Sequence, residues 1–298
     1  MEDTTNQKCG YVAVLGRPNA GKSSLLNHIA GEKVTMVSKK AQATRKRMNI
    51  IITHKNAQII FVDTPGIHKK ERMLNKFMLN EAIKAIGDSD LNLFLAPVTD
   101  SLDGYEEFLE LTKDKDIPHI LVLTKVDRVS QERVLKKIKE YQKYQDKFLA
   151  LVPYSIKSEQ SKERLLDLIA KNLPNHPWLF DSELLTTSHI RDIYRELIRE
   201  AIFDNFSDEI PYESDVVIDA IDEGEKLDRV YATIIVEKEQ QKGIVIGKRG
   251  EAIKRVGISA RKKLEESAQK KIFLDLKVAV KKNWSKKRGF LEELGYIF

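Results

Sequence analysis

One stretch of the chain, from Gly16 to Ser23, has the pattern Gly-x-x-x-x-Gly-Lys-Ser. An apolar run precedes it at residues 11–15, and a helix-forming segment follows it. In this setting the glycines let backbone N–H groups surround phosphate oxygens, and the start of the helix adds the positive end of its dipole. Lys22 is then placed for the β- and γ-phosphates, and the Ser23 hydroxyl for Mg²⁺. The stretch predicts a nucleotide site with the binding residues Gly16, Asn19, Ala20, Gly21, Lys22, Ser23 and Ser24.

A second motif, Asp63-Thr64-Pro65-Gly66, follows the apolar run at residues 57–62. The same residue types also occur in an ordinary turn. The position of this motif, behind a buried strand and about 40 residues beyond a phosphate loop, favours the functional interpretation. Asp63 is then placed to hold the Mg²⁺ shell, and the backbone N–H of Gly66 can approach the γ-phosphate.

A third motif, Thr124-Lys125-Val126-Asp127, follows the apolar run at residues 118–123, and a fourth, Ser155-Ile156-Lys157, follows the run at residues 149–152. Both suit a guanine base. The Asp127 carboxylate can accept hydrogen bonds from guanine N1–H and N2–H₂, which adenine does not offer, so the motif predicts GTP rather than ATP. Lys125 would lay its methylene groups against the base, and the backbone N–H of Ile156 would contact it. The predicted base-binding residues are Thr124, Lys125, Asp127, Ser155, Ile156 and Lys157.

In order and spacing, these four motifs resemble those of the translation-factor-like small GTPases. Two positions depart from the pattern of that group, because Thr124 stands where Asn is usual and Ile156 where Ala is usual. Thr replaces Asn in related GTPases, so we expect at most a lower affinity for the nucleotide. The resemblance implies GTP or GDP together with Mg²⁺ as the bound cofactors.

The same resemblance bears on hydrolysis. It implies that a loop between the first two motifs gives a threonine to Mg²⁺ and the γ-phosphate and orders only with GTP. Members of the resembled group usually have two adjacent threonines in this loop. Ala43 stands at the first of these positions, so Thr44 is the candidate ligand. Ile67 stands where Ras-like enzymes use a Gln to orient water, and we expect slow hydrolysis. In GTPases that have an apolar residue in place of this Gln, an asparagine that matches Asn19 holds an activating K⁺. The expected catalytic residues are Lys22, Thr44 and Gly66, and the expected metal ligands are Ser23, Thr44 and Asp63.

Strands and helices alternate around these motifs. The expected strands are residues 11–15, 48–53, 57–62, 91–96, 118–123 and 149–152. The expected helices are residues 22–30, 74–87, 103–115, 131–145 and 161–172. This alternation predicts an α/β domain over residues 8–173, with a mostly parallel sheet and helices on both faces. Ligands bind such sheets at the carboxyl ends of the strands, where the motifs fall.

Composition describes a soluble chain with an uneven charge. The 298 residues suffice for two domains, and the one cysteine cannot form an internal disulfide, which favours a reducing cytoplasm. Residues 181–241 carry 6 Lys and Arg against 17 Asp and Glu, whereas residues 242–298 carry 16 against 6. The basic end predicts a polyanionic partner, either nucleic acid or anionic lipid, and a solvated basic surface is the alternative.

The end of the chain predicts a second, smaller domain. Two prolines within residues 174–188 indicate a linker, and residues 189–298 then follow the order helix, two strands, two helices, strand. Glycines at the ends of Gly247-Lys248-Arg249-Gly250 separate the two adjacent helices. A Gly-x-x-Gly turn between helices grips the backbone of about four unpaired nucleotides in KH domains. The predicted RNA-binding residues are Ile246, Gly247, Lys248, Arg249, Gly250, Lys254, Arg255, Arg261 and Lys262.

A phosphate loop followed by a type II KH domain of α+β class resembles the Era family of bacterial ribosome-assembly GTPases. The resemblance covers nearly the whole chain, from about Lys8 to Phe298. It implies binding to the 3′ end of 16S ribosomal RNA and a role in assembly of the 30S ribosomal subunit. It also implies peripheral association of some members with the inner face of the cell membrane. We expect a monomer.

Two other functions agree with the same residues. The chain could be a GTP-dependent switch that acts mainly on a protein or membrane surface, with the KH fold as a docking module. It could also be a general RNA-binding protein whose nucleotide site has lost its function. The joint presence of Lys22, Ser23, Asp63 and Asp127 argues against the second alternative.

Overall fold

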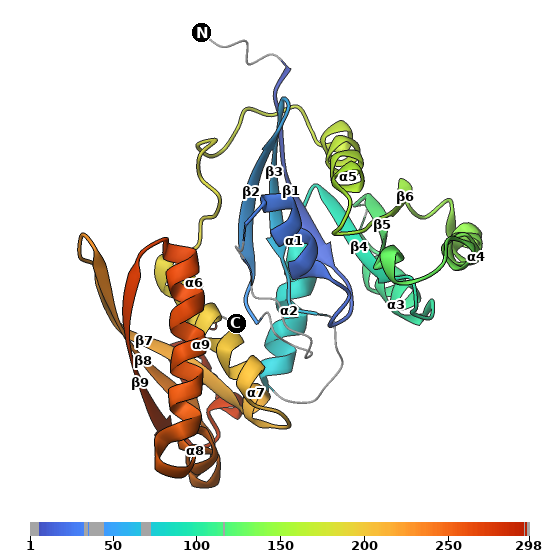
Figure 1. Ribbon diagram of the computed structural model, residues 1–298. Helices are drawn as coiled ribbons and strands as arrows, with labels where there is room; N and C mark the ends of the chain where they lie inside the picture. The colour runs from blue at the N-terminus through green and yellow to red at the C-terminus, as the bar shows by residue number, and fades with distance from the viewer. Residues whose placement is uncertain are drawn as a thin grey trace. The chain divides into compact units, whose positions relative to one another are not determined.

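The protein is described here by a computed structural model (Figure 1). Two compact units make up the chain: the first contains most residues up to Thr187, and the second contains residues 188 onward together with the start of one helix. No helix in the part of the chain that the structure describes is both long and apolar enough to cross a membrane. The described residues are 6–32, 35, 45–66, 73–115, 117–294 and 296.

A six-stranded sheet forms the centre of the first unit. Its strands are β1 (Lys8–Leu15), β2 (Met48–His54), β3 (Ala57–Asp63), β4 (Leu91–Pro97), β5 (His119–Thr124) and β6 (Ala150–Pro153). The strand order is β2-β3-β1-β4-β5-β6, and only the β2–β3 pair is antiparallel. Every residue of β3, β4 and β5 is buried, which explains why these strands read as continuous apolar runs.

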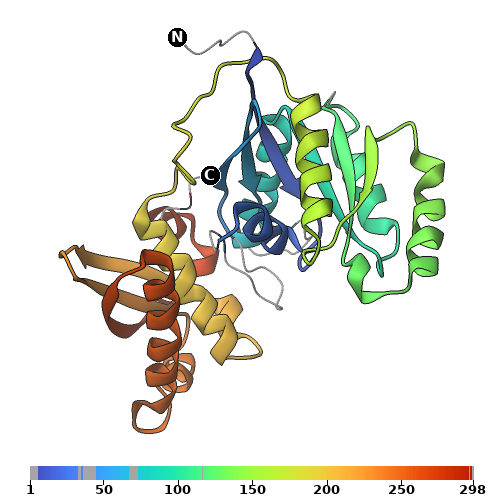
Figure 2. The ribbon, with the colours of Figure 1, turned by 45° about the horizontal axis from the view of Figure 1, so that its top comes forward.

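In the part of this unit that the structure describes, five helices cover the two faces of the sheet. They are α1 (Lys22–Ala30), α2 (Met73–Gly87), α3 (Asp103–Thr112), α4 (Gln131–Tyr141) and α5 (Glu159–Asn172). Leu25 of α1 and Ile169 of α5 belong to one apolar cluster with alternate residues of the central strands. Ile86 of α2, Phe108 of α3 and Tyr141 of α4 belong to a cluster on the other face. Figure 2 shows α1 and α5 in front of the sheet and α2 behind it. The prediction of a mostly parallel sheet between two helical layers is confirmed.

Residues 174–187, within the segment predicted as a linker, run alongside β2 and β3. The fully buried Gln58 accepts hydrogen bonds from the backbone N–H groups of Leu179 and Phe180, at 2.9 and 3.0 Å. Farther along, the Thr186 hydroxyl donates to the backbone oxygen of Asn49 at 2.6 Å. The segment therefore has fixed contacts within the first unit.

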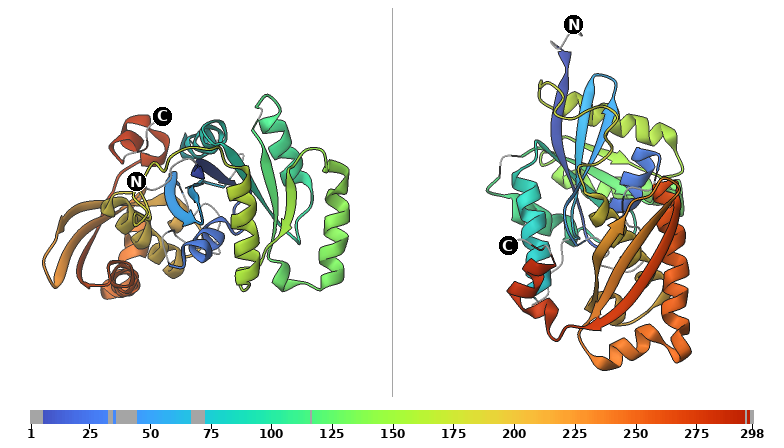
Figure 3. Two further views of the ribbon diagram at one scale, coloured as in Figure 1. Left: turned by 90° about the horizontal axis from the view of Figure 1, so that it is seen from above. Right: turned by 90° about the vertical axis from the view of Figure 1, so that its left-hand side faces the viewer.

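The second unit has a three-stranded sheet with helices on one face (Figure 3). Strand β8 lies in the middle, antiparallel to β7 and parallel to β9. Apolar residues of α6, α9 and the inner sheet face, such as Ile198, Leu264 and Ile234, form its core. The order of the larger elements agrees with the expected KH fold. The elements are α6 (Ile190–Asn205), α7 (Ile210–Glu213), β7 (Ser214–Asp222), β8 (Leu227–Val236), α8 (Glu239–Ile246), α9 (Glu251–Ala268), β9 (Lys271–Val280) and α10 (Arg288–Glu293).

The sequence did not indicate the ordered segment after β9. Trp284 is fully buried, and its Nε1 donates to the backbone oxygen of Glu213 at 3.1 Å. The Tyr296 hydroxyl donates to Asp215 at 2.6 Å, and Arg195 donates to the backbone oxygen of Leu294 at 2.8 Å. Single buried anchors of this kind leave no periodic pattern in the sequence, so sequence reasoning does not find them.

Some boundaries also differ from the expected ones. The helix expected over residues 131–145 is α-helical only to Tyr141, and a short 3-10 turn follows at Gln142–Tyr144. The first strand begins at Lys8, before the apolar run that predicted it, because its first residue still pairs with Ala57 of β3.

Candidate functional site

The phosphate loop joins β1 to α1 and has three backbone positions in the left-handed region. The φ angles are 143° at Gly16, 63° at Asn19 and 105° at Gly21. A side chain at Gly16 would place its Cβ 2.7 Å from the backbone oxygen of Leu95, so glycine is required there for space as well as for conformation. The helix begins at Lys22, directly after this turn, with its first N–H groups facing the loop.

Lys22 lies at the floor of the loop with only 7% of its surface exposed. Its ammonium group donates to the backbone oxygens of Gly16 at 3.1 Å and Arg17 at 3.2 Å. Burial lowers the pKa of Lys22 to about 8, while the charge of Asp63 acts in the opposite direction. A cation held in so little water interacts strongly with a phosphate anion.

Ser23 and Asp63 bring two oxygen atoms together beside the loop. The Ser23 hydroxyl lies 3.5 Å from Asp63 Oδ2, and Asp63 is almost fully buried at the end of β3. Its neighbour Thr64 donates to the backbone oxygen of Val14 at 2.7 Å, which fixes this strand end to β1. Hydroxyl and carboxylate oxygens are ligands that suit Mg²⁺, which also takes phosphate oxygens and water. The donor set therefore fits the metal that the sequence predicts.

Gly66 lies against the phosphate loop. A Cβ at this position would be 2.8 Å from the backbone nitrogen of Pro18 and 2.9 Å from its Cδ, so only glycine allows this approach. The backbone N–H of Gly66 is thereby kept close to the loop that would hold the phosphates. Two other predicted positions, Thr44 and Ile67, lie outside the described residues.

The predicted base-binding residues meet the phosphate loop from β5 and β6. The Thr124 hydroxyl donates to the backbone oxygen of Ala20 at 2.7 Å, and the Lys125 ammonium donates to that of Asn19. Thr124 therefore ties this loop to the phosphate loop, although it departs from the pattern of the resembled group. Lys157 Nζ lies 3.4 Å from Asp127 Oδ2. This contact joins the base loop after β6, which contains Lys157, to the base loop after β5, which contains Asp127. In that loop, Ser155 Oγ accepts from the backbone N–H of Lys157 at 3.1 Å, and the Ile156 side chain is exposed.

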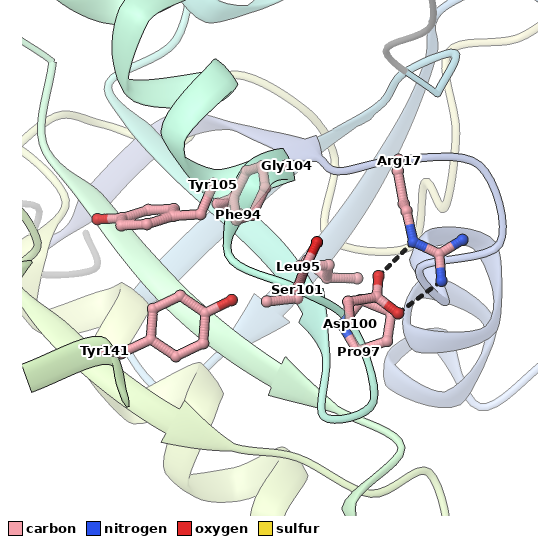
Figure 4. A pocket seen from close by; sticks show the side chains of 10 residues that line it. Arg17, Phe94, Leu95, Pro97, Asp100, Ser101, Gly104, Tyr105 and Tyr141 are labelled. Atoms are coloured by element: carbon pink, nitrogen blue, oxygen red, sulfur yellow. Dashed lines mark hydrogen bonds and ion pairs between the residues drawn. The ribbon is translucent and has the colours of Figure 1, made fainter. Parts of the chain in front are cut away.

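Arg17 and Asp100 form a pair beside the loop that the sequence did not single out (Figure 4). The Arg17 guanidinium makes two hydrogen bonds to the Asp100 carboxylate, from Nε to Oδ2 and from Nη2 to Oδ1, the second at 2.6 Å. Arg17 occupies a variable position of the motif, and Asp100 is distant in sequence. Only the fold brings them together.

The Gly-x-x-Gly turn of the second unit lies between α8 and α9, as the sequence predicts. The φ angles are 72° at Gly247, 54° at Arg249 and 79° at Gly250. A Cβ at Gly247 would be 2.6 Å from that of Ala252, whereas a Cβ at Gly250 would meet no atom within 4 Å. Gly247 is thus required for packing, and Gly250 leaves open space at the turn.

Basic side chains follow this turn on one face of α9. Lys248 and Arg249 are exposed, and so are the four basic residues of α9 that the sequence singled out. Ile258, which is 55% exposed, lies on the same face of the helix as these four residues. The opposite face is buried through Ala252, Val256, Ala260 and Leu264. The four exposed basic residues are Lys254, Arg255, Arg261 and Lys262.

Comparisons with protein-family models match both units. Residues 11–125 match the model described as "50S ribosome-binding GTPase". Residues 209–285 match the model of the KH domain.

Comparisons with individual proteins match nearly the whole chain. A GTPase Era of Helicobacter pylori is 53% identical over 294 residues, which is 97% of each chain. A GTPase Era of Campylobacter concisus is 49% identical over 290 residues, covering 97% of this chain and 100% of that one.

Two solved structures are similar over 98% of this chain and 100% of theirs, each with 32% identity. One is a variant of Aquifex aeolicus Era bound to GDP·AlF4⁻, with a TM-score of 0.92. The other is Era in complex with MgGDPNP and nucleotides 1506–1542 of 16S ribosomal RNA, with a TM-score of 0.93.

Proposed function

The chain belongs to the Era family of GTPases, and from this premise we propose that its GTP cycle controls RNA binding during assembly of the 30S ribosomal subunit. The proposed RNA is single-stranded and lies at the 3′ end of 16S ribosomal RNA, in keeping with the fragment bound by the similar Era structure. The proposed place of action is the cytoplasm.

In the nucleotide site, each residue has a proposed task. Lys22 leaves the loop carbonyls for the β- and γ-phosphates, while Ser23 and Asp63 hold Mg²⁺ directly or through water. Gly66 donates its N–H to the γ-phosphate, and Thr44 completes the Mg²⁺ shell. Water attacks the γ-phosphorus in line, without a Gln to orient it; the bond to the β-phosphate oxygen breaks, and GDP and inorganic phosphate leave. Asn19 would hold K⁺, whose charge would offset the charge that develops on the phosphates.

Guanine is proposed to lie over Lys125 with its edge toward Asp127. The pair between Asp127 and Lys157 supports this, because it places the carboxylate at the meeting point of the two base loops. The remaining proposed contacts come from Thr124, Ser155 and the backbone of Ile156.

The RNA site of the proposal is the turn Gly247–Gly250 together with the basic face of α9. The observation that carries it is the open space at Gly250 beside exposed Lys248 and Arg249, because a phosphate needs both close approach and positive charge. Lys254, Arg255, Arg261 and Lys262 would continue the track of positive charge, and Ile246 precedes the turn.

The division of labour proposed here is a GTPase domain at residues 8–173, a linker at 174–188 and a KH domain at 189–298. GTP is proposed to raise RNA affinity, because the loop around Thr44 would order against the γ-phosphate. Thermodynamic linkage then requires that RNA tighten GTP binding by the same factor.

A titration tests this function. A single-stranded RNA that matches the 3′ end of 16S ribosomal RNA is titrated against the monomeric protein in GDP and in a non-hydrolysable GTP analogue. We expect tighter binding with the analogue and little binding to a duplex of the same sequence. Equal affinities for the RNA in both nucleotides would remove the switch and leave two independent activities.

A parallel titration addresses the alternative function. Vesicles of anionic lipid replace the RNA, at the same salt concentration. Nucleotide-dependent binding to vesicles without nucleotide-dependent binding to RNA would favour peripheral membrane association and the docking role of the KH fold.

A further inference from the structure

The pair of Arg17 and Asp100 lies outside the residues assigned to nucleotide binding. The two side chains meet through parallel hydrogen bonds, the geometry that gives an arginine–carboxylate pair both strength and a fixed orientation. The Asp100 side chain is 16% exposed and that of Arg17 is 50% exposed. Solvent therefore reaches the guanidinium more than the carboxylate.

The backbone beside Arg17 contacts two parts of the phosphate site. Its carbonyl oxygen accepts from the Lys22 ammonium at 3.2 Å. The next residue, Pro18, is the one that Gly66 approaches so closely that no side chain fits between them. The Arg17 guanidinium also donates to the backbone oxygen of Pro18 at 3.0 Å. The position of this short segment therefore affects both the phosphate-binding lysine and the glycine that approaches the γ-phosphate.

On its other side, Asp100 belongs to the loop between β4 and α3. Its backbone N–H donates to the backbone oxygen of Pro97 at 2.9 Å, and its backbone oxygen accepts from the Lys137 ammonium of α4 at 2.8 Å. These contacts fix the backbone of Asp100 to the rigid sheet and to α4. The carboxylate is then a fixed point from which Arg17 can be held.

A cavity of about 270 Å³ adjoins the pair (Figure 4). Phe94, Tyr105 and Tyr141 supply much of its wall, and Arg17 and Asp100 lie at one end. This side of the carboxylate borders the cavity, so the ion pair restrains the two loops in addition to the close approach of Gly16 to Leu95. The cavity also gives a small anion a path to the guanidinium.

We propose that Asp100 is a positioning residue for GTP binding and hydrolysis, which acts by holding Arg17 and with it the phosphate loop. Without the carboxylate, the segment at Arg17 and Pro18 moves relative to Lys22 and Gly66. Such a displacement weakens the contacts to the phosphates, so bound nucleotide leaves faster. The side chains proposed to contact the base are unchanged, so the preference for guanine persists.

The first experiment measures the dissociation rate of fluorescent GDP from the Mg²⁺-loaded protein. We expect Asp100→Ala to raise this rate about ten-fold and to leave the ratio of GDP to ADP affinity unchanged. Asp100→Glu, which keeps the carboxylate, should recover most of the slow rate. The matched control is Asp167→Ala, which removes a carboxylate bound to His54 and Lys55 far along the chain from the phosphate loop. Its dissociation rate should equal that of the unchanged protein.

The second experiment uses the cavity. Formate added to Asp100→Ala should enter beside Arg17 and slow dissociation again, whereas chloride at the same ionic strength should not. Thermal unfolding of each variant without nucleotide separates a folding defect from a local one. A rate for Asp100→Ala within two-fold of the unchanged protein, or an Asp100→Glu rate as fast as that of Asp100→Ala, would overturn the proposal.

Discussion

The two proposed sites of the molecule, one for the nucleotide and one for RNA, use positive charge in opposite ways. In the first unit Lys22 is buried and fixed by backbone oxygens, whereas in the second unit Lys248 and Arg249 extend into solvent from a turn with no buried residue. A buried charge interacts strongly with one anion in one position, and exposed charges interact weakly with any anion nearby. We therefore expect the nucleotide site to depend on the exact ligand and the RNA site to depend on salt.

The largest expected effect is a change of base preference when the Asp127 carboxylate of the nucleotide site is replaced by an amide. Asp127→Asn turns an acceptor into a donor at the edge of the base, so the preference should move from guanosine to xanthosine nucleotides. We expect a change in the ratio of the two affinities of about a hundred-fold or more. Competition between GDP and XDP for a fluorescent nucleotide measures it. Unchanged guanine preference would mean that Asp127 does not read the base.

RNA affinity should fall when a bulky, negatively charged side chain is placed at the Gly-x-x-Gly turn. Gly250→Asp places a carboxylate in the open space where a phosphate must approach, and RNA affinity should fall about ten-fold or more. Aspartate tolerates the positive φ of this position better than most residues, so the unit should still fold. The matched control, Gly289→Asp, adds the same side chain where there is also open space, and RNA affinity should stay the same. Equal losses in both variants would show a general effect of negative charge.

A smaller effect should follow from pH in the nucleotide site alone. Because the pKa of Lys22 is lowered to about 8, the free protein must take up a proton above this pH before the ammonium can bind phosphate. GDP affinity should therefore fall about four-fold between pH 7.0 and 8.5. Isothermal titration in buffers of different ionisation enthalpy also reports the proton uptake. Lys22→Met should bind weakly at both pH values and show no such slope.

The smallest expected effect is a change in the salt dependence of RNA affinity when one exposed charge of the proposed RNA site is removed. Each lost phosphate contact lowers the slope of log affinity against log salt by about 0.7 for single-stranded nucleic acid. Lys254→Ala should show this decrease, whereas Lys226→Ala, in the acidic turn between β7 and β8, should not. RNA titrations over a range of salt concentrations give the slopes. A similar decrease in both variants would place the RNA over a wider surface than the basic face of α9.

The motifs of the proposed nucleotide site could be recognised in the sequence because the backbone geometry they need constrains short segments. A phosphate loop needs glycines at set positions, as the φ angles at Gly16 and Gly21 show, and this need leaves a pattern in the sequence. The fold class followed from the alternation of apolar runs and helices, since strands covered on both faces must be mostly apolar.

Features that depend on pairs distant in sequence could not be predicted. Nothing near Asp100 indicates that Arg17 lies beside it, and nothing near Trp284 indicates that Glu213 accepts its hydrogen bond. Gln58 is another example, because a polar residue within an apolar strand shows its role only when residues 179 and 180 lie beside it. In each case the partner is set by the tertiary fold.

The path of residues 174–187 has a consequence for the solubility of the first unit. Strand β2 is the last strand on its side of the sheet, and an open strand of this kind offers unpaired backbone groups to other chains. Here the N–H of Ile51 donates to the backbone oxygen of Leu185 at 2.8 Å, and Ile50 forms a bridge with Thr186. A chain shortened to residues 1–173 would expose this apolar edge. Such a fragment should aggregate during synthesis or storage, although it contains every motif of the nucleotide site.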